Sequence, residues 1–250
     1  MRPNKIFWLS ILLLLVPFLS FGQGIPIPNF NLRLGSAQSP SEVSSVLQIF
    51  VLLTVLSLAP AILILTTSFT RIIIVFSLLR SALGTQQSPP NQVLIGLAMF
   101  LTFFIMAPVW NDINTKAFDP YMSNRISQQN ALDQATVSIK KFMAKYTREK
   151  DLGLFVRISG IKAPRNINDI PLWVMIPAFV ISELKTAFII GFVIYIPFLV
   201  IDMIVAAVLM AMGMMMLPPI MISLPLKLML FVLIDGWFLL IGSLVKSFTG

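Results

Sequence analysis

Long apolar runs dominate this sequence and constrain its fold more than any other feature. Residues 43–79 form one run that a single charge, Arg71, interrupts, and residues 174–216 form another. Each run is far longer than the ~20 residues that a helix needs to cross a bilayer. Only 11% of the residues are charged, against roughly a quarter in soluble proteins. Because helices satisfy their own backbone groups in lipid, we expect an all-α integral membrane protein.

The residue types that are missing narrow the function. The chain has no cysteine and no histidine, which removes thiol chemistry, the usual zinc sites and the commonest general base. We therefore expect no enzyme, no metal site and no cofactor. The chain has a net charge of +8, and ten of its eighteen basic residues lie in residues 111–170, together with six acidic residues. This mixture indicates a solvated helical domain rather than a surface for nucleic acid.

The ends and breaks of the apolar runs give a domain layout. Residues 1–22 resemble a secretory signal peptide, with basic Arg2 and Lys5 before a short apolar stretch; the alternative is a first anchor helix. Residues 23–42 read as an irregular N-terminal arm. The remaining segments are a first helical hairpin (43–110), a periplasmic helical domain (111–170) and a second helical hairpin (171–250).

Prolines and periodicity add local expectations. Pro60 is expected to kink the first run, and Pro108 to end a second helix over 93–109. In the polar region, apolar residues at steps of three and four from Leu132 to Tyr146 predict an amphipathic helix, and a short second helix is expected over 148–158. The kinked segments are expected to bend around a shared axis.

The signal peptide sets the orientation. After cleavage the N-terminus lies outside the cytoplasm, so the 111–170 region is expected outside as well. The loop with the methionines and prolines before the last apolar segment then faces the cytoplasm. The basic residues of 111–170 oppose the positive-inside rule, but that rule holds for short loops.

Ionisable residues within the apolar segments are candidate functional residues, because such groups are costly in lipid. They either pair between helices or subunits, or they form a conduction or coupling path. Glu183 and Lys185 are two residues apart and cannot face each other on one helix, so each needs a partner elsewhere, which suits an oligomer. These residues are Arg71, Glu183, Lys185, Asp202, Lys227 and Asp235.

Five methionines lie within residues 210–216, and Pro218 and Pro219 follow. One interpretation is ordinary packing, because methionine fills irregular gaps. The other is a deformable apolar constriction at the end of a helix that the prolines terminate.

Several long motifs resemble the FliP family, the flagellar member of the type III secretion export gate. The resemblance covers about 67–245. It rests on "TSFTRIIIVFSLLRSALGTQQSPPNQVLIGLAMFLTFFIMAPV" (67–109), "KKFMAKYTREKDLGLF" (140–155), "PAFVISELKTAFIIGF" (177–192) and "MGMMMLPPIMISLPLKLMLFVLIDGW" (212–237).

The resemblance implies a pore-forming subunit that conducts unfolded flagellar proteins across the bacterial inner membrane at the flagellar basal body. It implies a homo-oligomeric ring of five copies, completed by FliR and FliQ, with FlhA, FlhB and, for assembly, FliO as further partners. It also implies that the apolar segments of the assembled gate need not span the bilayer literally. The alternatives are a secondary transporter for a small solute and a non-conducting membrane scaffold. A transporter is expected to carry internal repeats, and we find none.

The resemblance assigns roles to individual residues. It places the pore gate at Met214, Met215 and Met216 and leaves Met210 and Met212 to packing. It places subunit contacts at Phe142, Phe155 and Glu183, whereas the residues alone favour core packing for the two phenylalanines.

Overall fold

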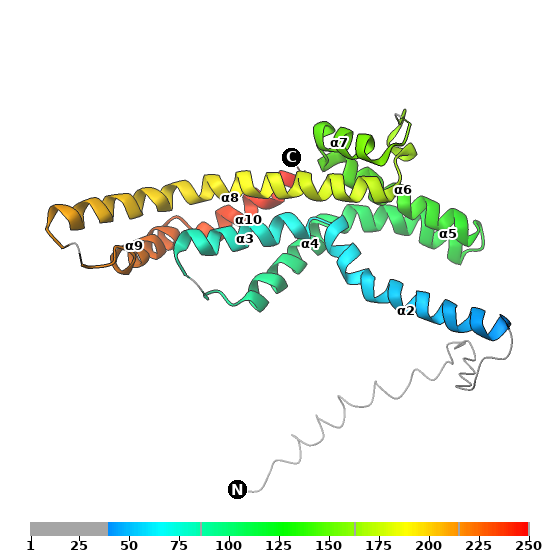
Figure 1. Cartoon of the computed structure of the whole chain (residues 1–250), viewed down its shortest axis with the longest axis horizontal. Coiled ribbons are helices and arrows are strands. Elements are labelled where there is room, and N and C mark those ends of the chain that lie inside the picture. Colours follow the sequence, from blue (N-terminus) through cyan, green and yellow to red (C-terminus); the bar gives the residue numbers. More distant parts are fainter. Residues whose placement is uncertain (1–39, 86, 163, 215, 250) are drawn as a thin grey trace, which may run out of the picture. The chain divides into compact units, whose positions relative to one another are not determined.

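A computed structural model of the chain (Figure 1) describes residues 40–85, 87–162, 164–214 and 216–249. The expected signal peptide (1–22) and most of the arm (23–39) lie outside these residues. The chain divides into two compact units, Met1–Leu53 and Thr54–Gly250. The described part of the first unit is the start of one helix.

The described residues are mainly helical, in agreement with the expected all-α class. The elements are α2 (Pro40–Thr66), α3 (Phe69–Leu83), α4 (Asn91–Ile113), a π-helix (Asn114–Phe118), α5 (Asp119–Met122), α6 (Gln128–Tyr146), α7 (Glu149–Ser159), a 3₁₀ helix (Ile167–Asp169), α8 (Leu172–Ala211), α9 (Ile220–Leu233) and α10 (Gly236–Thr249).

Within the residues that the structure describes, three helical segments are long and apolar enough to cross a membrane, namely Ile49–Thr66, Asn91–Met122 and Leu172–Ala211. The pair α9 and α10 gives a fourth if its two helices, bent by 64°, count as one span. The described residues therefore fit the membrane class that the apolar runs predict.

The first apolar run breaks at Thr67–Ser68 and not at Pro60, which lies inside α2. Hydroxyl groups explain the position of the break. Thr66 and Thr67 donate to the carbonyl oxygens of Ile62 and Leu63, each at 2.8 Å. Such back-bonding bends helices, whereas an apolar helix can accommodate a proline by local adjustment of its backbone.

The helix that begins at Asn91 also runs past its expected end. α4 continues through Pro108, and the π-helix and α5 carry the helical chain on to Met122. The boundary expected between residues 110 and 111 therefore falls inside helical chain, and the domain layout itself stays a prediction.

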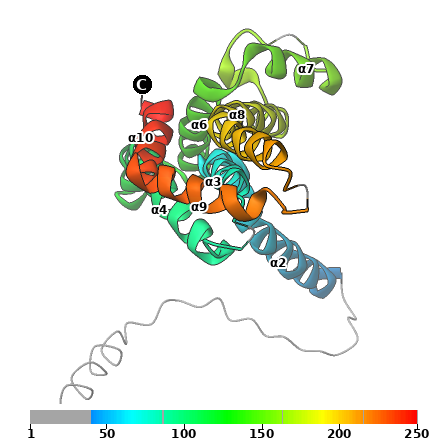
Figure 2. The same ribbon diagram turned by 90° about the vertical axis from the view of Figure 1, so that its left-hand side faces the viewer.

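Helices α6 and α7 form the polar region and lie against α8. Figure 2 shows α6 beside α8, with α7 above them. The predicted amphipathic face of α6 is confirmed where Phe142 and Met143 are buried, but Leu132, at the start of that face, is exposed. α6 begins where the Ser127 side chain accepts a hydrogen bond from the Asn130 N–H, as expected of an N-cap.

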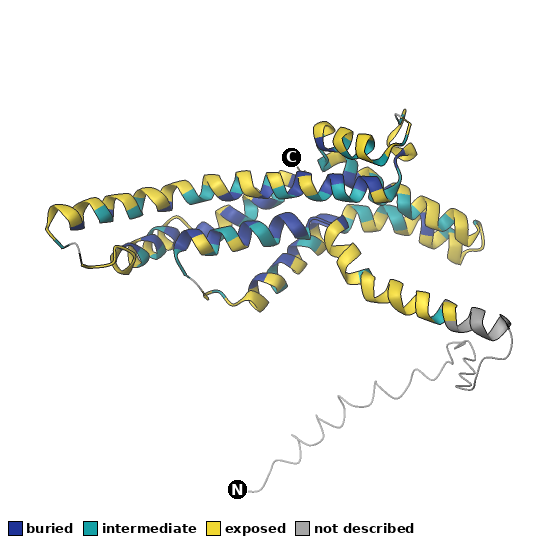
Figure 3. Cartoon of the chain, viewed as in Figure 1, coloured by how far each residue is buried: buried dark blue, intermediate teal, exposed yellow. Residues whose placement is uncertain are grey.

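The core of the larger unit lies between α3 and α8. Its centre contains Ile72, Val75 and Phe76 from α3, and Met175 and Phe179 from α8, all at or near zero exposure. Figure 3 shows buried residues concentrated on α3 and on part of α8, whereas the C-terminal half of α8 is mostly exposed. α8 passes through Pro177 and Pro197 without a break.

Candidate functional site

The methionine loop, residues 212–219, joins α8 to α9 and is the expected pore gate. α8 ends at Ala211, and Gly213, two residues further on, has a left-handed φ of 76°. The Met214 N–H donates to the Leu209 carbonyl and the Gly213 N–H to the Met210 carbonyl, both at 3.0 Å. This pair of bonds is a Schellman motif, so the loop leaves the helix in a defined direction.

The methionines of this loop differ in exposure. Met214 is half-buried, Met216 is 98% exposed, and Met215 lies outside the described residues. Met210 and Met212, which were expected to pack, are instead 61% and 65% exposed. In the single chain the apolar thioether surface therefore extends over both sides of the turn.

An ion pair with a buried lysine holds α9 next to α8. The Lys227 ammonium lies 2.5 Å from the Asp202 carboxylate and donates to the Ala82 carbonyl at 3.2 Å. Ala82 belongs to the last turn of α3, where a cation is favourable to the helix dipole. The Lys227 side chain is 4% exposed and the Asp202 side chain 35%. Lys227 thus joins α9, α8 and the end of α3.

A second charge cluster is centred on Arg71 of α3. Its Nε donates to the Glu183 carboxylate at 2.8 Å, and its Nη2 pairs with the other carboxylate oxygen. Its Nη1 donates to the Ser247 hydroxyl at 2.9 Å and to the Ser247 carbonyl at 3.2 Å. Arg71 is 3% exposed and Glu183 is fully buried. The guanidinium therefore fixes α8 and the C-terminal helix α10 to α3.

Aromatic rings close over this guanidinium. Arg71 Cζ lies 3.8 Å from the centroid of the Phe248 ring and 5.5 Å from that of Tyr146. The Tyr146 hydroxyl donates to the Phe248 carbonyl, and the two rings pack edge to face with centroids 5.2 Å apart. Such cation–π contacts are strongest where water is excluded.

The structure decides how the expected charged residues are arranged in one chain. Arg71 pairs with Glu183 and Lys227 with Asp202, so these four residues pair between helices of one chain, which is one of the alternatives that the sequence leaves open. Lys185 and Asp235 are exposed. Asp235 has a φ of 51° and marks the bend between α9 and α10. The alternative role of these residues in a conduction or coupling path stays a prediction.

The residues expected at subunit contacts are largely covered in the single chain. Phe142 is 8% exposed and packs against the rings of Tyr146 and Phe179 at 5.1 and 5.9 Å between centroids. Phe155 is half-buried against the core, and Glu183 has no exposed surface. Of these three residues, only Phe155 keeps appreciable exposed side-chain surface for a neighbouring copy.

Sequence reasoning missed the polar junction between α7 and α8. Asp151 forms a two-bond pair with Arg148, each bond at 2.8 Å. The Ser182 hydroxyl donates to Asp151 at 2.6 Å and accepts from the Arg148 backbone N–H at 3.0 Å. Burial alone would raise the pKa of Asp151, but the bonds from Ser182 and Arg148 outweigh it and hold this pKa below its usual range. The one sequence feature that could have indicated this junction is Ser182, a polar residue next to Glu183 within an apolar run.

Comparison with known proteins decides the family. The FliP family matches residues 52–244. The chain belongs to the FliP family. It is 59% identical over 220 residues to the flagellar biosynthetic protein FliP of Bacillus subtilis (strain 168), covering 88% of this chain and all of that relative.

Other FliP proteins are similar along most of their length. The FliP of Aquifex aeolicus is 47% identical over 242 residues, which cover 96% of this chain and 98% of that protein. The FliP of Pectobacterium carotovorum is 57% identical over 201 residues, which cover 80% and 78% respectively. The resemblance to the FliP family is therefore confirmed, and with it a role in flagellar biosynthesis at the membrane; a small-solute transporter is not favoured.

Proposed function

We propose that this chain is the pore-forming core subunit of the flagellar type III export gate. It conducts unfolded flagellar proteins across the bacterial inner membrane at the flagellar basal body. Membership of the FliP family supports the role in flagellar biosynthesis. The observation that carries the pore role is the methionine loop, which exposes Met216 at the end of a helix whose direction Gly213 fixes.

The physical argument concerns how an apolar constriction closes and opens. Unbranched thioether side chains exclude water from a narrow passage, and they reshape around a passing chain of any sequence. Branched side chains would also exclude water but are stiffer. The Lys227–Asp202 pair would hold the helices still while the loop side chains move.

The proposal includes an assembly. Copies of the chain form a ring, taken as five from the resemblance, together with FliR and FliQ, and FlhA, FlhB and FliO are further partners. Residues 111–170 lie in the periplasm and the methionine loop faces the cytoplasm. A reporter enzyme fused within 111–170 tests this orientation, because a reporter that is active only in the cytoplasm should be silent there.

An ion-leak measurement tests the pore. We expect the triple change of Met214, Met215 and Met216 to alanine to increase leakage of potassium or a small dye through the assembled complex in liposomes by at least severalfold. Met210→Ala with Met212→Ala is the matched control, since both residues remain on or beside α8, and it should leave the leak near that of the unchanged protein. An unchanged leak through a fully assembled triple variant would favour a non-conducting scaffold.

A further inference from the structure

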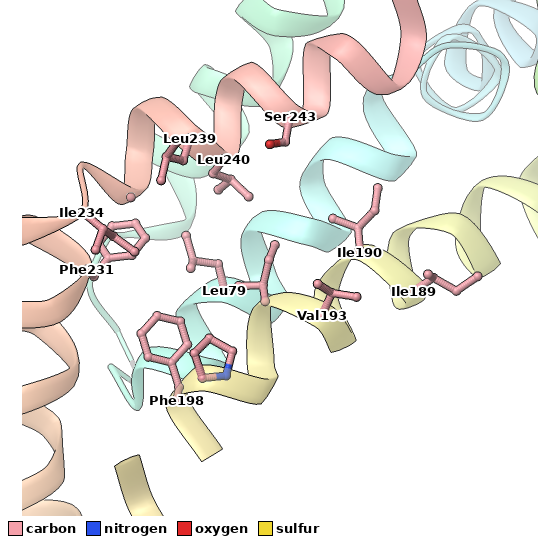
Figure 4. A pocket seen from close by; sticks show the side chains of 13 residues that line it. Leu79, Ile189, Ile190, Val193, Phe198, Phe231, Ile234, Leu239, Leu240 and Ser243 are labelled. Carbon is pink, nitrogen blue, oxygen red and sulfur yellow. The ribbon is translucent and has the colours of Figure 1, made fainter. Parts of the chain in front are cut away.

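Two apolar grooves run along α8 and share one wall. The first, of about 370 Å³, lies where α8 faces α3 and the bent pair α9–α10. Figure 4 shows side chains gathered around it, among them Leu79 of α3, Val193 of α8 and Phe231 of α9. The second, of about 460 Å³, is lined by Leu78 and by residues of α8 that include Lys185 and Tyr195. Ile189 and Val193 line both grooves.

The bend between α9 and α10 creates the first groove and is built into the chain. Gly236 follows the left-handed Asp235, and a Cβ at Gly236 would lie 2.2 Å from the Phe231 ring. The ring and the backbone therefore meet closely at the bend. Because α8 stays continuous while its neighbours turn by 64°, the side chains of this unit leave an apolar space open to the outside.

The cationic side chain of Lys185 lies one helical turn from the wall of Ile189 and Val193 that the two grooves share. Lys185, Ile189, Val193 and Pro197 follow one another at intervals of four along α8 and form one ridge. This ridge winds around the helix by about 120°, from the second groove at Lys185 to the first groove at Pro197. The distance from Lys185 to Pro197 along the axis is roughly 18 Å, close to the ~15 Å of hydrocarbon in one leaflet. The ridge from Lys185 to Pro197 thus matches the hydrocarbon of one leaflet in length, and Ile189 and Val193 at its centre are the part that both grooves share.

Lys185 also lies at the boundary of the apolar part of α8. Between Lys185 and Asp202 no residue is charged, and this stretch spans about 24 Å. On the other side of Lys185, Ser182 binds the polar helix α7. Among the described residues no carboxylate lies within ion-pair distance of Lys185. The charge of Lys185 acts on the Asp151 carboxylate, but Asp151 forms its ion pair with Arg148.

We propose that these two grooves bind one anionic phospholipid, with its phosphate at Lys185 and an acyl chain on each side of the Ile189–Val193 wall. Charge complementarity selects the headgroup, because an exposed lysine near the bilayer surface attracts anionic lipid. Apolar walls select the tails, since space of this kind holds hydrocarbon rather than water. The inference does not depend on the pore role of the methionine loop.

Native mass spectrometry of the purified membrane complex tests this site, with palmitoyl-oleoyl phosphatidylglycerol and the matching phosphatidylcholine as probes. We expect the unchanged protein to retain the anionic lipid about fivefold better, the effect of one lysine near the membrane surface. Lys185→Gln should remove the preference. Lys246→Gln, which alters an exposed lysine of α10 that lines neither groove, should retain it.

A second pair of variants tests the grooves themselves. Val193 is 61% exposed, so Val193→Trp fills both grooves without entering the core, and it should lower retention of both lipids severalfold. Val208→Trp, on the same helix but outside both grooves, should not. Unchanged lipid retention in Val193→Trp, or an anionic preference that survives Lys185→Gln, would overturn the proposal. It would equally be overturned if Val193→Trp reduced the number of copies per complex and left lipid retention intact, because the grooves would then be an interface between copies.

Discussion

Glu183→Ala separates the two roles that sequence and structure assign to this residue. The resemblance to the family places Glu183 at a subunit contact, whereas the structure buries it fully beneath Arg71. Removing the carboxylate deletes both bonds from Nε and Nη2 and leaves a guanidinium that is 3% exposed without its counter-charge. We therefore expect the substitution to destabilise the single chain before any assembly.

The expected loss of unfolding free energy follows from the burial of the Arg71–Glu183 pair. Breaking a buried ion pair by removing one partner costs about 3–5 kcal/mol, a large share of the ~5–15 kcal/mol that stabilises a typical domain. The hydrogen bonds to Ser247 survive, which places the expected loss near the lower end, about 3 kcal/mol. The double change Arg71→Met with Glu183→Leu should cost less than Glu183→Ala alone, because it leaves no unpaired charge.

The assay is equilibrium unfolding of the monomeric chain in mixed micelles, followed by circular dichroism, alongside the yield of assembled complex. We expect Glu183→Ala to shift unfolding and the double variant to recover part of the loss. Lys185→Ala, two residues away and exposed, is the control and should change the free energy of unfolding by less than about 0.5 kcal/mol. Normal unfolding of Glu183→Ala with lost assembly would refute the reasoning and support the contact role.

Three further predictions concern other parts of the chain. Asp202→Ala should cost more unfolding free energy than Lys227→Met, about 3 against about 1 kcal/mol, because the ammonium left behind is buried while the carboxylate reaches solvent; micelle unfolding of both variants checks the order. Gly236→Ala should destabilise by about 1–3 kcal/mol through overpacking against the Phe231 ring, which thermal unfolding measures. The lowered pKa of Asp151 means that its carboxylate stabilises the α7–α8 junction at neutral pH. This contribution fades as the pH falls below about 4 and through the lowered pKa. The protease sensitivity of α7 should therefore rise from pH 7 to pH 2 in the original chain and depend less on pH in Asp151→Asn.

Periodicity and apolar length sufficed for the existence and type of most helices. The amphipathic helix ending at Tyr146 and the short helix after it were predicted within a few residues. The breaks were harder. Pro60, Pro108, Pro177 and Pro197 all lie inside helices, because an apolar helix can accommodate a proline by local adjustment of its backbone.

For the candidate residues too, the sequence identified single residues but not their partners. Sequence identified Arg71, Glu183, Asp202 and Lys227 as costly charges that need partners, but it could not pair them, because each pair joins residues far apart in the chain. The same holds for Ser247, which no local pattern marks and which becomes important only where α10 meets Arg71.

The amino-acid sequence was sufficient for the protein class, the restricted chemistry and the family. Apolar length required a membrane helix protein, the absence of cysteine and histidine restricted its chemistry, and the motifs indicated the FliP family that the comparisons confirm. Tertiary structure alone decided which charges neutralise one another, where the helices bend and which apolar faces remain open. The physical reason is that ion pairing, close ring-to-backbone contact and burial depend on distances through space, and the order of residues along the chain does not fix those distances.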